Sequence, residues 1–429
     1  MSMTLSLFLV TLVLFIAMGI PVAFSLLACS LVMMLQMDMY DSQIVAQRLV
    51  GGANNFALMA IPFFILAGEV MNAGGMSQRV VDLPLKLCGH LQGGLGYVAI
   101  IATVIMASLS GSAVADTAAI GAVIIPLMSR SGYPLRASAG LVAAGGIIAP
   151  IIPPSMPFIL FGVTANVSIA RLFMGGIVPG LIMGFALMTV WFFHSRKLDL
   201  KLQPKASFDE IVHSALSSVW ALVLPVIIIG GFRFGLFTAT EAGAVAAVYA
   251  AVIGLFVYRE LTLKTLYTVL VNTVRTVGVV MFLVAAANVS GYLMALANLP
   301  NAVAELFGPL IDSPRLLLAL IMLFMLFVGM VMDLSPAILI LVPVMMPLVR
   351  AAGINEAYFG ILFVLNLCIG LITPPVGNVL NVITGVAKIK FDEAARGVFP
   401  YLCTHIVVLM ILIAWPSLVI TPMRFIMGR

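Results

Sequence analysis

Long stretches without a single charged residue constrain the fold of this chain more than any other feature. Residues 1–37 contain no Asp, Glu, Lys or Arg, and the same holds for residues 91–115, 137–170, 172–193 and 316–332. A helix needs about 20 apolar residues to cross the hydrocarbon core of a bilayer. A soluble domain carries roughly 25% charged residues, whereas 9% of these residues are charged and 63% are hydrophobic. We therefore expect an all-α polytopic membrane protein with about ten to twelve membrane segments, because the alternation typical of barrel strands is absent.

The basic residues are scattered through short loops, as expected where positive charge marks the cytoplasmic side of a membrane protein. The net charge of +5 therefore does not indicate a nucleic-acid binder. No Lys or Arg precedes Arg48, so the N-terminus is expected on the periplasmic side. The densest basic group predicts a cytoplasmic linker at residues 194–215 and consists of His194, Arg196, Lys197, Lys201 and Lys205.

One motif occurs twice in the chain, and such self-similarity is decisive for the architecture. The first copy occupies residues 110–128 and reads SGSAVADTAAIGAVIIPLM. The second occupies residues 329–347 and reads GMVMDLSPAILILVPVMMP. In each copy one Asp stands in an apolar segment with a Pro ten residues later, which gives the pairs Asp116 with Pro126 and Asp333 with Pro343.

A Pro-Pro pair follows each of these Asp residues at a similar distance. The first pair begins 37 residues after Asp116, within GGIIAPIIPPSMP, and the second begins 41 residues after Asp333, within GLITPPVGN. Landmarks that recur in the same order and spacing predict two membrane repeats, residues 1–193 and 216–429, joined by the linker.

Such repeats predict a transporter, because transporters commonly arrange them with inverted topology and form their sites near the midplane from discontinuous helices. A Pro-Pro pair removes two backbone donors and breaks a regular helix. Within a bilayer, broken backbone is tolerated only where it is buried in protein or lines a cavity. The small residues of SGSAVAD also suit the tip of a helical hairpin. We therefore expect two inverted repeats with helical hairpins and broken helices.

Asp116 and Asp333 are each the only charged residue in an apolar stretch of more than thirty residues. An intramembrane carboxylate indicates a functional site by default, although an Asp that caps a helix at a hairpin tip is the alternative. Carboxylate, hydroxyl and freed carbonyl oxygens suit a hard cation. Two symmetry-related sodium sites are therefore predicted, with neighbouring hydroxyls from Ser110, Ser112, Thr117, Ser335 and Thr373. Any single Ser or Thr could instead hydrogen-bond to the carbonyl of its own helix.

Two other isolated acids are Glu69 and Glu241. Glu241 follows Thr238 by three residues, the spacing of a capping box, so we expect a structural role. Glu69 lies near the polar stretch 72–79 and is expected to mark a membrane edge. The four histidines match no metal-binding spacing, and the four cysteines form no readable disulfide framework.

These landmarks resemble the large membrane subunit of the tripartite ATP-independent periplasmic (TRAP) transporters, which include C4-dicarboxylate and sialic-acid systems. The Ser-rich tip and the Pro-Pro loop are also similar to those of divalent-anion/sodium symporters. The resemblance spans almost the whole chain, and its stretches are GIPVAF (19–24), AIPFFILAGEVM (60–71), SGSAVADTAAIG (110–121), PIIPPSMPFILFG (150–162), FTATEAGAVAAVYA (237–250), GMVMDLSPAILILVPVMMPL (329–348) and GLITPPVGNVLNV (370–382).

The resemblance implies a multi-pass protein of the bacterial inner membrane that works by sodium symport. A periplasmic binding protein would deliver a carboxylate, with sialic acid or another sugar acid preferred over a C4-dicarboxylate. A small four-helix membrane subunit is expected as a separate chain, because this chain begins directly at the large subunit. The implied mechanism is an elevator, in which a transport domain slides against a scaffold.

The resemblance also assigns candidate site residues by motif. The first sodium site would comprise Ser110, Ser112, Asp116, Gly145 and Pro150. The second would comprise Gly329, Asp333, Gly370 and Thr373. Substrate contacts are expected from Pro154, Ser155, Pro375 and Asn378, although Asn378 could instead brace its loop.

Two rival functions remain open from the sequence. A stand-alone sodium/dicarboxylate symporter of the divalent-anion type would need no binding protein. An intramembrane aspartyl protease would use Asp116 and Asp333 as a pair of carboxylates that share a site. However, neither Asp lies in a GxGD sequence, the Pro-Pro loops would have no role, and no HExxH, GxSxG or P-loop motif occurs. We therefore expect a transporter and not an enzyme.

Overall fold

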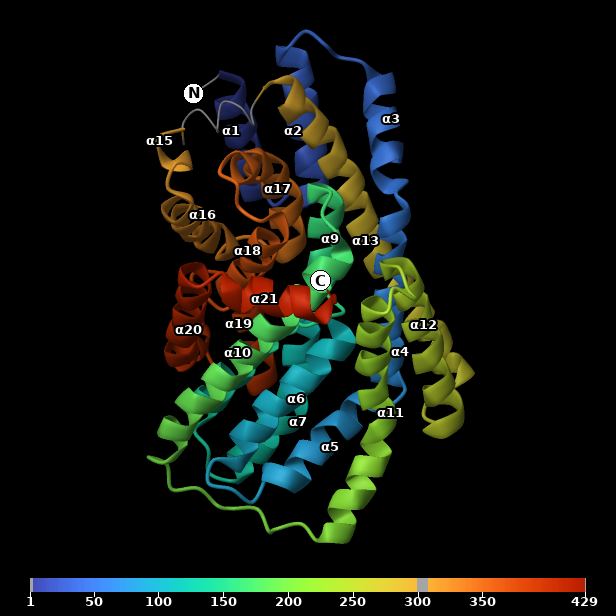
Figure 1. Ribbon diagram of the computed structural model, residues 1–429, viewed down its shortest axis with the longest axis vertical. Helices are drawn as coiled ribbons and strands as arrows, with labels where there is room; N and C mark the ends of the chain where they lie inside the picture. The colour runs from blue at the N-terminus through green and yellow to red at the C-terminus, as the bar shows by residue number, and fades with distance from the viewer. Residues whose placement is uncertain (1–2, 299–307, 429) are drawn as a thin grey trace.

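The computed structural model of the protein describes residues 3–298 and 308–428, and these residues form helices and loops without any β-strand (Figure 1). Eight helical segments of the described chain are long and apolar enough to cross a membrane. The prediction of an all-α polytopic membrane protein is thus confirmed. These segments are Phe56–Ala73 (η1, Phe56–Met59, and α4, Ala60–Ala73), Ala113–Arg130 (α7), Ile169–Ser195 (α10), Phe208–Arg233 (α11), Ala239–Val257 (α12, Ala239–Val252, and η2, Ile253–Val257), Leu263–Leu296 (α13), Leu334–Ala351 (α17) and Phe391–Ala414 (α20).

The rest of the apolar chain forms shorter helices, and the expected total of about ten to twelve membrane segments stays a prediction. Pro-Pro pairs interrupt two of the apolar runs and divide each of them into two short helices. These shorter helices are α1 (Met3–Ala17), α2 (Val22–Gln36), α3 (Ser42–Ala53), α5 (Met76–Cys88), α6 (Gly94–Ser110), α8 (Leu135–Gly146), α9 (Met156–Ala165), α15 (Gly308–Ile311), α16 (Pro314–Gly329), α18 (Glu356–Gly370), α19 (Asn378–Ala387) and α21 (Ser417–Ile426).

The same sequence of elements occurs twice. In the first occurrence a hairpin of α6 and α7 precedes an interrupted helix made of α8 and α9, and α10 follows. In the second, α16 and α17 precede the interrupted helix of α18 and α19, and α20 follows. Both Pro-Pro peptide bonds, 153–154 and 374–375, are cis and lie within the interruptions.

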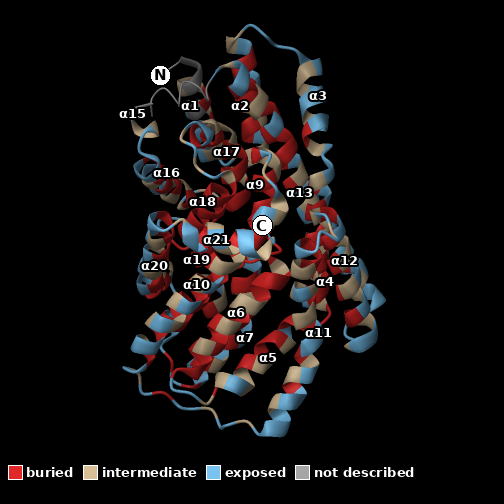
Figure 2. Cartoon of the chain, viewed as in Figure 1, coloured by how far each residue is buried: buried red, intermediate tan, exposed pale blue. Residues whose placement is uncertain are grey.

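Helices of each set pack against helices of the other set. The second piece of each interrupted helix lies against the hairpin of the other set, since α9 packs on α17 and α19 packs on α7. The first pieces behave likewise, because α8 packs on α20 and α18 packs on α10. Helices α8 and α18 are almost wholly buried as a result (Figure 2). Together these helices form one packed body, the central body, which occupies the middle and the left of the view in Figure 1.

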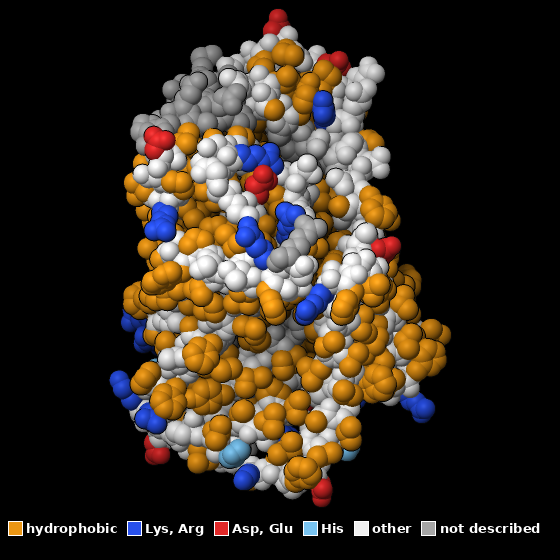
Figure 3. Space-filling view, viewed as in Figure 1, with side chains coloured by type: hydrophobic (Ala, Val, Ile, Leu, Met, Phe, Trp, Pro, Cys, Tyr) orange, Lys and Arg blue, Asp and Glu red, His pale blue; other side chains and the backbone are white. Residues whose placement is uncertain are grey.

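A second group of helices flanks this body on one side. Helix α13 packs on α2, α3 and α4, while α12 packs on α4 and α11 packs on α5. In Figure 1, α2, α3 and α13 occupy the upper part, α4 and α12 the right-hand edge, and α5 and α11 the lower part. Hydrophobic side chains cover much of the visible face, and charged side chains gather near its lower end and in its upper half (Figure 3).

Several helices begin at a Ser or Thr that accepts a hydrogen bond from the backbone three residues later, which satisfies one of the free N–H groups of a first turn. Thr238 and Glu241 form the expected capping box: Thr238 N donates to Glu241 Oε2 over 2.7 Å, and Glu241 N donates to Thr238 Oγ1 over 3.3 Å. The structural role predicted for Glu241 is therefore confirmed. Ser112, Ser155, Ser168 and Ser207 cap α7, α9, α10 and α11 in the same way.

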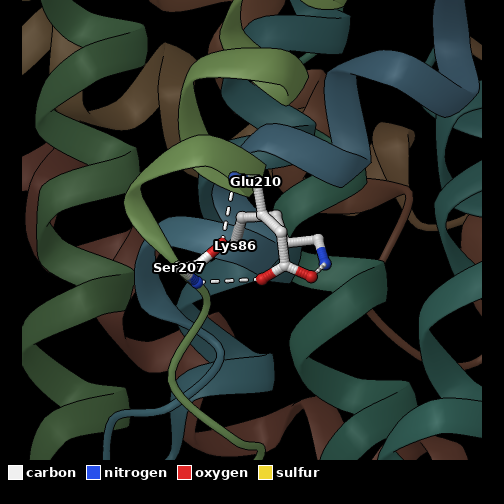
Figure 4. A network of polar contacts seen from close by, with 3 residues as sticks. All are labelled: Lys86, Ser207 and Glu210. Carbon is white, nitrogen blue, oxygen red and sulfur yellow. Dashed lines mark hydrogen bonds and ion pairs between the residues drawn. The ribbon is translucent and has the colours of Figure 1, made fainter.

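The basic connection is shorter than the predicted linker 194–215. Helix α10 continues to Ser195 and α11 begins at Phe208, because Ser207 and Glu210 form a capping box that starts the helix there. In Figure 4, Glu210 lies between Ser207 and Lys86: its Oε2 accepts from Ser207 N over 2.9 Å, and its Oε1 lies 3.3 Å from Lys86 Nζ of α5. The division of the chain into repeats at 1–193 and 216–429 stays a prediction.

Candidate functional site

The first hairpin tip lies directly against the first Pro-Pro loop. Ser110 ends α6, Gly111 adopts a φ of +66°, and Ser112 is the N-cap of α7. Ser112 N donates to Ser110 Oγ over 3.3 Å, so the two hydroxyls bracket the turn. A Cβ on Gly111 would overlap the carbonyl oxygen of Pro154. Glycine is therefore required twice, for its backbone conformation and for the close approach of the loop.

Asp116 points its carboxylate into the interior next to this tip. It lies in the first turn of α7, its side chain is 1% exposed, and its Oδ2 makes no hydrogen bond within the described chain. A cavity of about 160 Å³ is lined by Asp116 together with Ser110, Ser112 and Pro154. A buried polar oxygen without a partner is costly, so this carboxylate calls for a ligand, a water or a proton.

The end of α8 packs on the same hairpin. Thr117 Oγ1 is buried without a hydrogen-bond partner in the described chain, and a Cβ on Gly146 would overlap it. A Cβ on Gly145 would lie 3.1 Å from Thr103 Oγ1 of α6. Hydroxyl and carboxylate oxygens left unsatisfied beside a helix end match the donor set of a hard cation. The residues present therefore fit the first predicted sodium site, which remains a prediction.

Two other residues of the first loop, Ser155 and Pro150, are hydrogen-bonded to each other. Ser155 is fully buried and caps α9, and its Oγ accepts from Phe158 N over 3.3 Å. The same hydroxyl donates to the carbonyl oxygen of Pro150. Ser155 and Pro150, predicted for substrate and sodium, thus brace the loop in this arrangement.

The second hairpin tip also meets its own loop. A Cβ on Gly370 would lie 2.5 Å from Gly329 Cα, so the two glycines bring α16 and α18 into backbone contact. Gly377 N donates to the carbonyl of Met330 over 3.3 Å, which ties the Pro-Pro loop to the tip. Thr373 Oγ1 donates to the carbonyl of Ile369 over 2.7 Å. Three of the four residues predicted for the second sodium site, Gly329, Gly370 and Thr373, therefore cluster.

Asp333 differs from Asp116 in its surroundings. It occupies the N-cap position of α17 without a side-chain capping bond, and it is exposed. Its carboxylate forms no ion pair with another described residue. The two loops differ in the same sense, because Pro154 is buried whereas Pro375 is exposed, and Asn378 at the start of α19 is partly exposed. The first site is enclosed, and the second is open.

Four polar residues of the first cavity come from outside the repeated motifs, and no sequence pattern joins them to Asp116. Glu69 and Asn72 of α4, Ser77 of α5 and Thr276 of α13 line the cavity with Asp116. Glu69 was singled out as an isolated acid, but its expected place at a membrane edge did not indicate the cavity wall. Asn72, Ser77 and Thr276 carry no pattern that distinguishes them from other polar residues of apolar helices.

Comparison with known proteins identifies relatives over nearly the full length of the chain. The family model described as "Tripartite ATP-independent periplasmic transporter, DctM component" matches residues 9–418. The 2,3-diketo-L-gulonate TRAP transporter large permease protein YiaN of Escherichia coli is 58% identical over 411 residues, covering 96% of this chain and 97% of the relative. The sialic acid TRAP transporter large permease protein SiaM of Vibrio cholerae is 39% identical, covering 93% of each chain.

A solved structure shares the fold. The YdaH transporter of Alcanivorax borkumensis superposes with a TM-score of 0.66 at 16% identity, covering 88% of this chain and 90% of the other. The relatives are transporter permeases, which confirms that the chain is a transport protein and not an enzyme. The chain therefore belongs to the DctM family and is a large membrane subunit of a tripartite ATP-independent periplasmic transporter.

Proposed function

We propose that this permease takes up a sugar acid, driven by sodium ions that bind at the two hairpin tips. The observation that carries the proposal is the buried Asp116 carboxylate, whose Oδ2 lacks a partner and faces a cavity at the tip of a hairpin. A carboxylate in that position is stabilised by a cation and not by the apolar residues around it.

The proposed ion sites use different donors in the two sets. At the first tip the donors are Asp116, Thr117 and backbone carbonyls near Gly145; at the second they are Thr373, Asp333 and the carbonyls beside Gly329 and Gly370. A bound sodium ion supplies positive charge that offsets the buried carboxylate and draws each tip onto its loop. Because the second tip is open in this arrangement, binding there would involve closure around Asp333.

A sugar acid is proposed as the substrate on chemical and comparative grounds. The short helices α9 and α19 begin at the two Pro-Pro loops, and their first turns offer backbone N–H groups with partial positive charge. Such groups suit a carboxylate. The relative named for 2,3-diketo-L-gulonate is 58% identical, against 39% for the relative named for sialic acid, so a six-carbon keto sugar acid is the substrate that we propose.

An elevator mechanism is proposed because the helices divide into two groups. The hairpins and interrupted helices pack mainly on one another, while α11, α12 and α13 pack on α2, α3, α4 and α5. One tip is enclosed and the other open, as expected if the central body has moved toward one side of its surroundings. The flanking helices would then be the scaffold.

The remaining components follow from the family. A tripartite system includes a small membrane subunit and a periplasmic binding protein, and we propose both as separate partners in a bacterial inner membrane. The connection that follows α10 lies at the lower end of Figure 1 and carries Arg196, Lys197, Lys201 and Lys205. The positive-inside rule makes this end cytoplasmic.

Uptake into proteoliposomes tests the proposal. The chain is reconstituted with its small subunit, and uptake of labelled 2,3-diketo-L-gulonate is measured with the cognate binding protein under an inward sodium gradient or in potassium. We expect uptake that needs both sodium and the binding protein and that fails in Asp116→Ala and Asp333→Ala. Uptake without the binding protein would instead favour a stand-alone symporter. Equal uptake in potassium would refute sodium coupling.

A further inference from the structure

A second cavity lies between the two groups of helices, away from the hairpin tips. It has a volume of about 300 Å³, at the lower end of the range for small-molecule sites. Arg48, Asn55, Asn288 and Tyr292 line one wall. The opposite wall consists of Val163 and Thr164 of α9 with Leu339 and Pro343 of α17. We call this cavity the Arg48 pocket.

The charge in the Arg48 pocket is positive and uncompensated. Arg48 forms no ion pair with another residue of the described ranges. None of the four helices that line the pocket, α3, α9, α13 and α17, contains an Asp or Glu. The nearby polar side chains are neutral amides and hydroxyls. An exposed guanidinium among such groups is a site for an anion.

The guanidinium also lies against an aromatic ring. Its Cζ lies 3.7 Å from the centroid of the Tyr292 ring, so the ring supports one face of the group. Gly52 allows α3 to lie close to α13, because a Cβ there would lie 2.6 Å from Asn288 Cβ. Stacking leaves the edge N–H groups of Arg48 available, and these match the two oxygens of a carboxylate.

The pocket lies on the side of the tips opposite the basic connection. Arg350 Nη2 at the end of α17 donates to the carbonyl of Ala165 at the end of α9 over 2.9 Å, so both helices finish at the same surface. Helix α10 starts there and runs for 27 residues, about 40 Å, toward the basic connection. Thr164 lies one residue before the end of α9, and Pro343 lies midway along α17, between the tip that precedes this helix and its end. The pocket thus lies between the tips and the surface assigned to the periplasm.

We propose that the Arg48 pocket binds the carboxylate of the incoming sugar acid before the substrate reaches the hairpin tips. The proposal rests on the sugar-acid substrate proposed above. The wall of α3 and α13 belongs to the flanking helices, whereas α9 and α17 belong to the central body. The pocket can therefore bind the anion only in conformations in which these two walls face each other. We place this binding step at the entry of the substrate, before it reaches the hairpin tips.

Chemical modification of Arg48 tests binding directly. Phenylglyoxal reacts with free guanidinium groups, and modification of Arg48 is followed by mass spectrometry of the permease in phosphatidylcholine vesicles. The protecting sugar acid is L-gulonate, because the vicinal dicarbonyl of 2,3-diketo-L-gulonate would itself react with guanidinium groups. We expect L-gulonate to slow the reaction and its uncharged lactone, L-gulono-1,4-lactone, to leave it unchanged. A parallel set of vesicles contains phosphatidylglycerol, because a lipid headgroup could offer the same anionic chemistry. Protection by phosphatidylglycerol alone would overturn the proposal.

Uptake kinetics give the second readout. We expect Arg48→Gln to raise the KM for the sugar acid about tenfold, the value of one charge-assisted hydrogen bond, while kcat is retained. Arg48→Lys should fall between, since it keeps the charge but loses the planar fork. Arg275→Gln is the matched control, because it removes an exposed positive charge from α13 outside the pocket.

The two proposals fail in different ways. If the wild type takes up the sugar acid but neither the sugar acid nor succinate or sialic acid protects Arg48, the pocket is refuted and the proposed function stands. If a carboxylate protects Arg48 but sodium drives no uptake, the proposed function fails and the pocket stands. If Arg48→Gln and Arg275→Gln raise the KM equally, the loss of any positive charge on these helices has the same effect. That outcome would refute a binding site at Arg48.

Discussion

Replacement of Gly370 by alanine tests whether the second tip works through backbone contact with α18. A Cβ at this position would lie 2.5 Å from Gly329 Cα and 2.7 Å from its carbonyl oxygen, where ordinary contacts are 3.4–4 Å. The tip must therefore move by about 1 Å, and such overpacking costs about 1–3 kcal/mol in a close-packed interior. Gly370 has no positive φ, so the effect is steric and not conformational.

Gly385→Ala is the matched control for this change. Gly385 lies in α19, and nothing lies within 4 Å of a Cβ built there, so alanine should stabilise the helix by about 0.5–1 kcal/mol. We expect Gly370→Ala to unfold at a lower temperature than Gly385→Ala in detergent and to need about five- to tenfold more sodium for half-maximal uptake. Equal melting temperatures and equal sodium dependence would refute the reasoning.

Three further changes probe other parts of the molecule. Gly111→Ala should abolish uptake, because it combines a φ of +66° with overlap on the Pro154 carbonyl. Gly235→Ala is its control, since Gly235 has a φ of +67° with open space around it, and this variant should retain uptake; equal activity of the two would argue against the contact. Thr117→Val removes a buried hydroxyl that lacks a partner in the described chain, so the stability of the protein should be unchanged or higher. If that hydroxyl binds the ion, the sodium concentration for half-maximal uptake should rise about tenfold, and an unaltered sodium titration would remove Thr117 from the site. Ser207→Ala should cost about 1 kcal/mol of helix capping and speed tryptic cleavage at Lys205, and an unchanged cleavage rate would show that the α11 start does not depend on this cap.

The sequence predicted those parts of the site that recur within one short segment. Asp116, Gly329 and Gly370 stood out because each belongs to a motif that appears twice, and the structure brings the last two into contact. The wall residues Glu69 and Thr276 could not be joined to Asp116, because tertiary packing alone unites α4, α7 and α13. The Arg48 pocket likewise could not be predicted from the sequence, because its lining residues come from four different helices.

The difference between the two tips was also beyond the sequence. Both Pro-Pro loops carry similar residues, yet Pro154 is buried and Pro375 is exposed. Local sequence determines that each loop breaks its helix. Whether a Pro-Pro loop is exposed depends on the position of the central body relative to the flanking helices. That position belongs to one conformation of the protein and cannot be predicted from the local sequence.

The packing of helices of one set on helices of the other set has a consequence for synthesis in the cell. Helix α7 ends at Arg130, but its partner α19 begins at Asn378, 248 residues later. At about 5–20 residues per second, a ribosome needs about 12–50 seconds to make that interval. Throughout this time the face of α7 that α19 will cover must wait in the membrane without its final neighbour. Biogenesis of the permease therefore depends on shielding of the unfinished first half, and a chain that stops before Asn378 should be a target for membrane proteases.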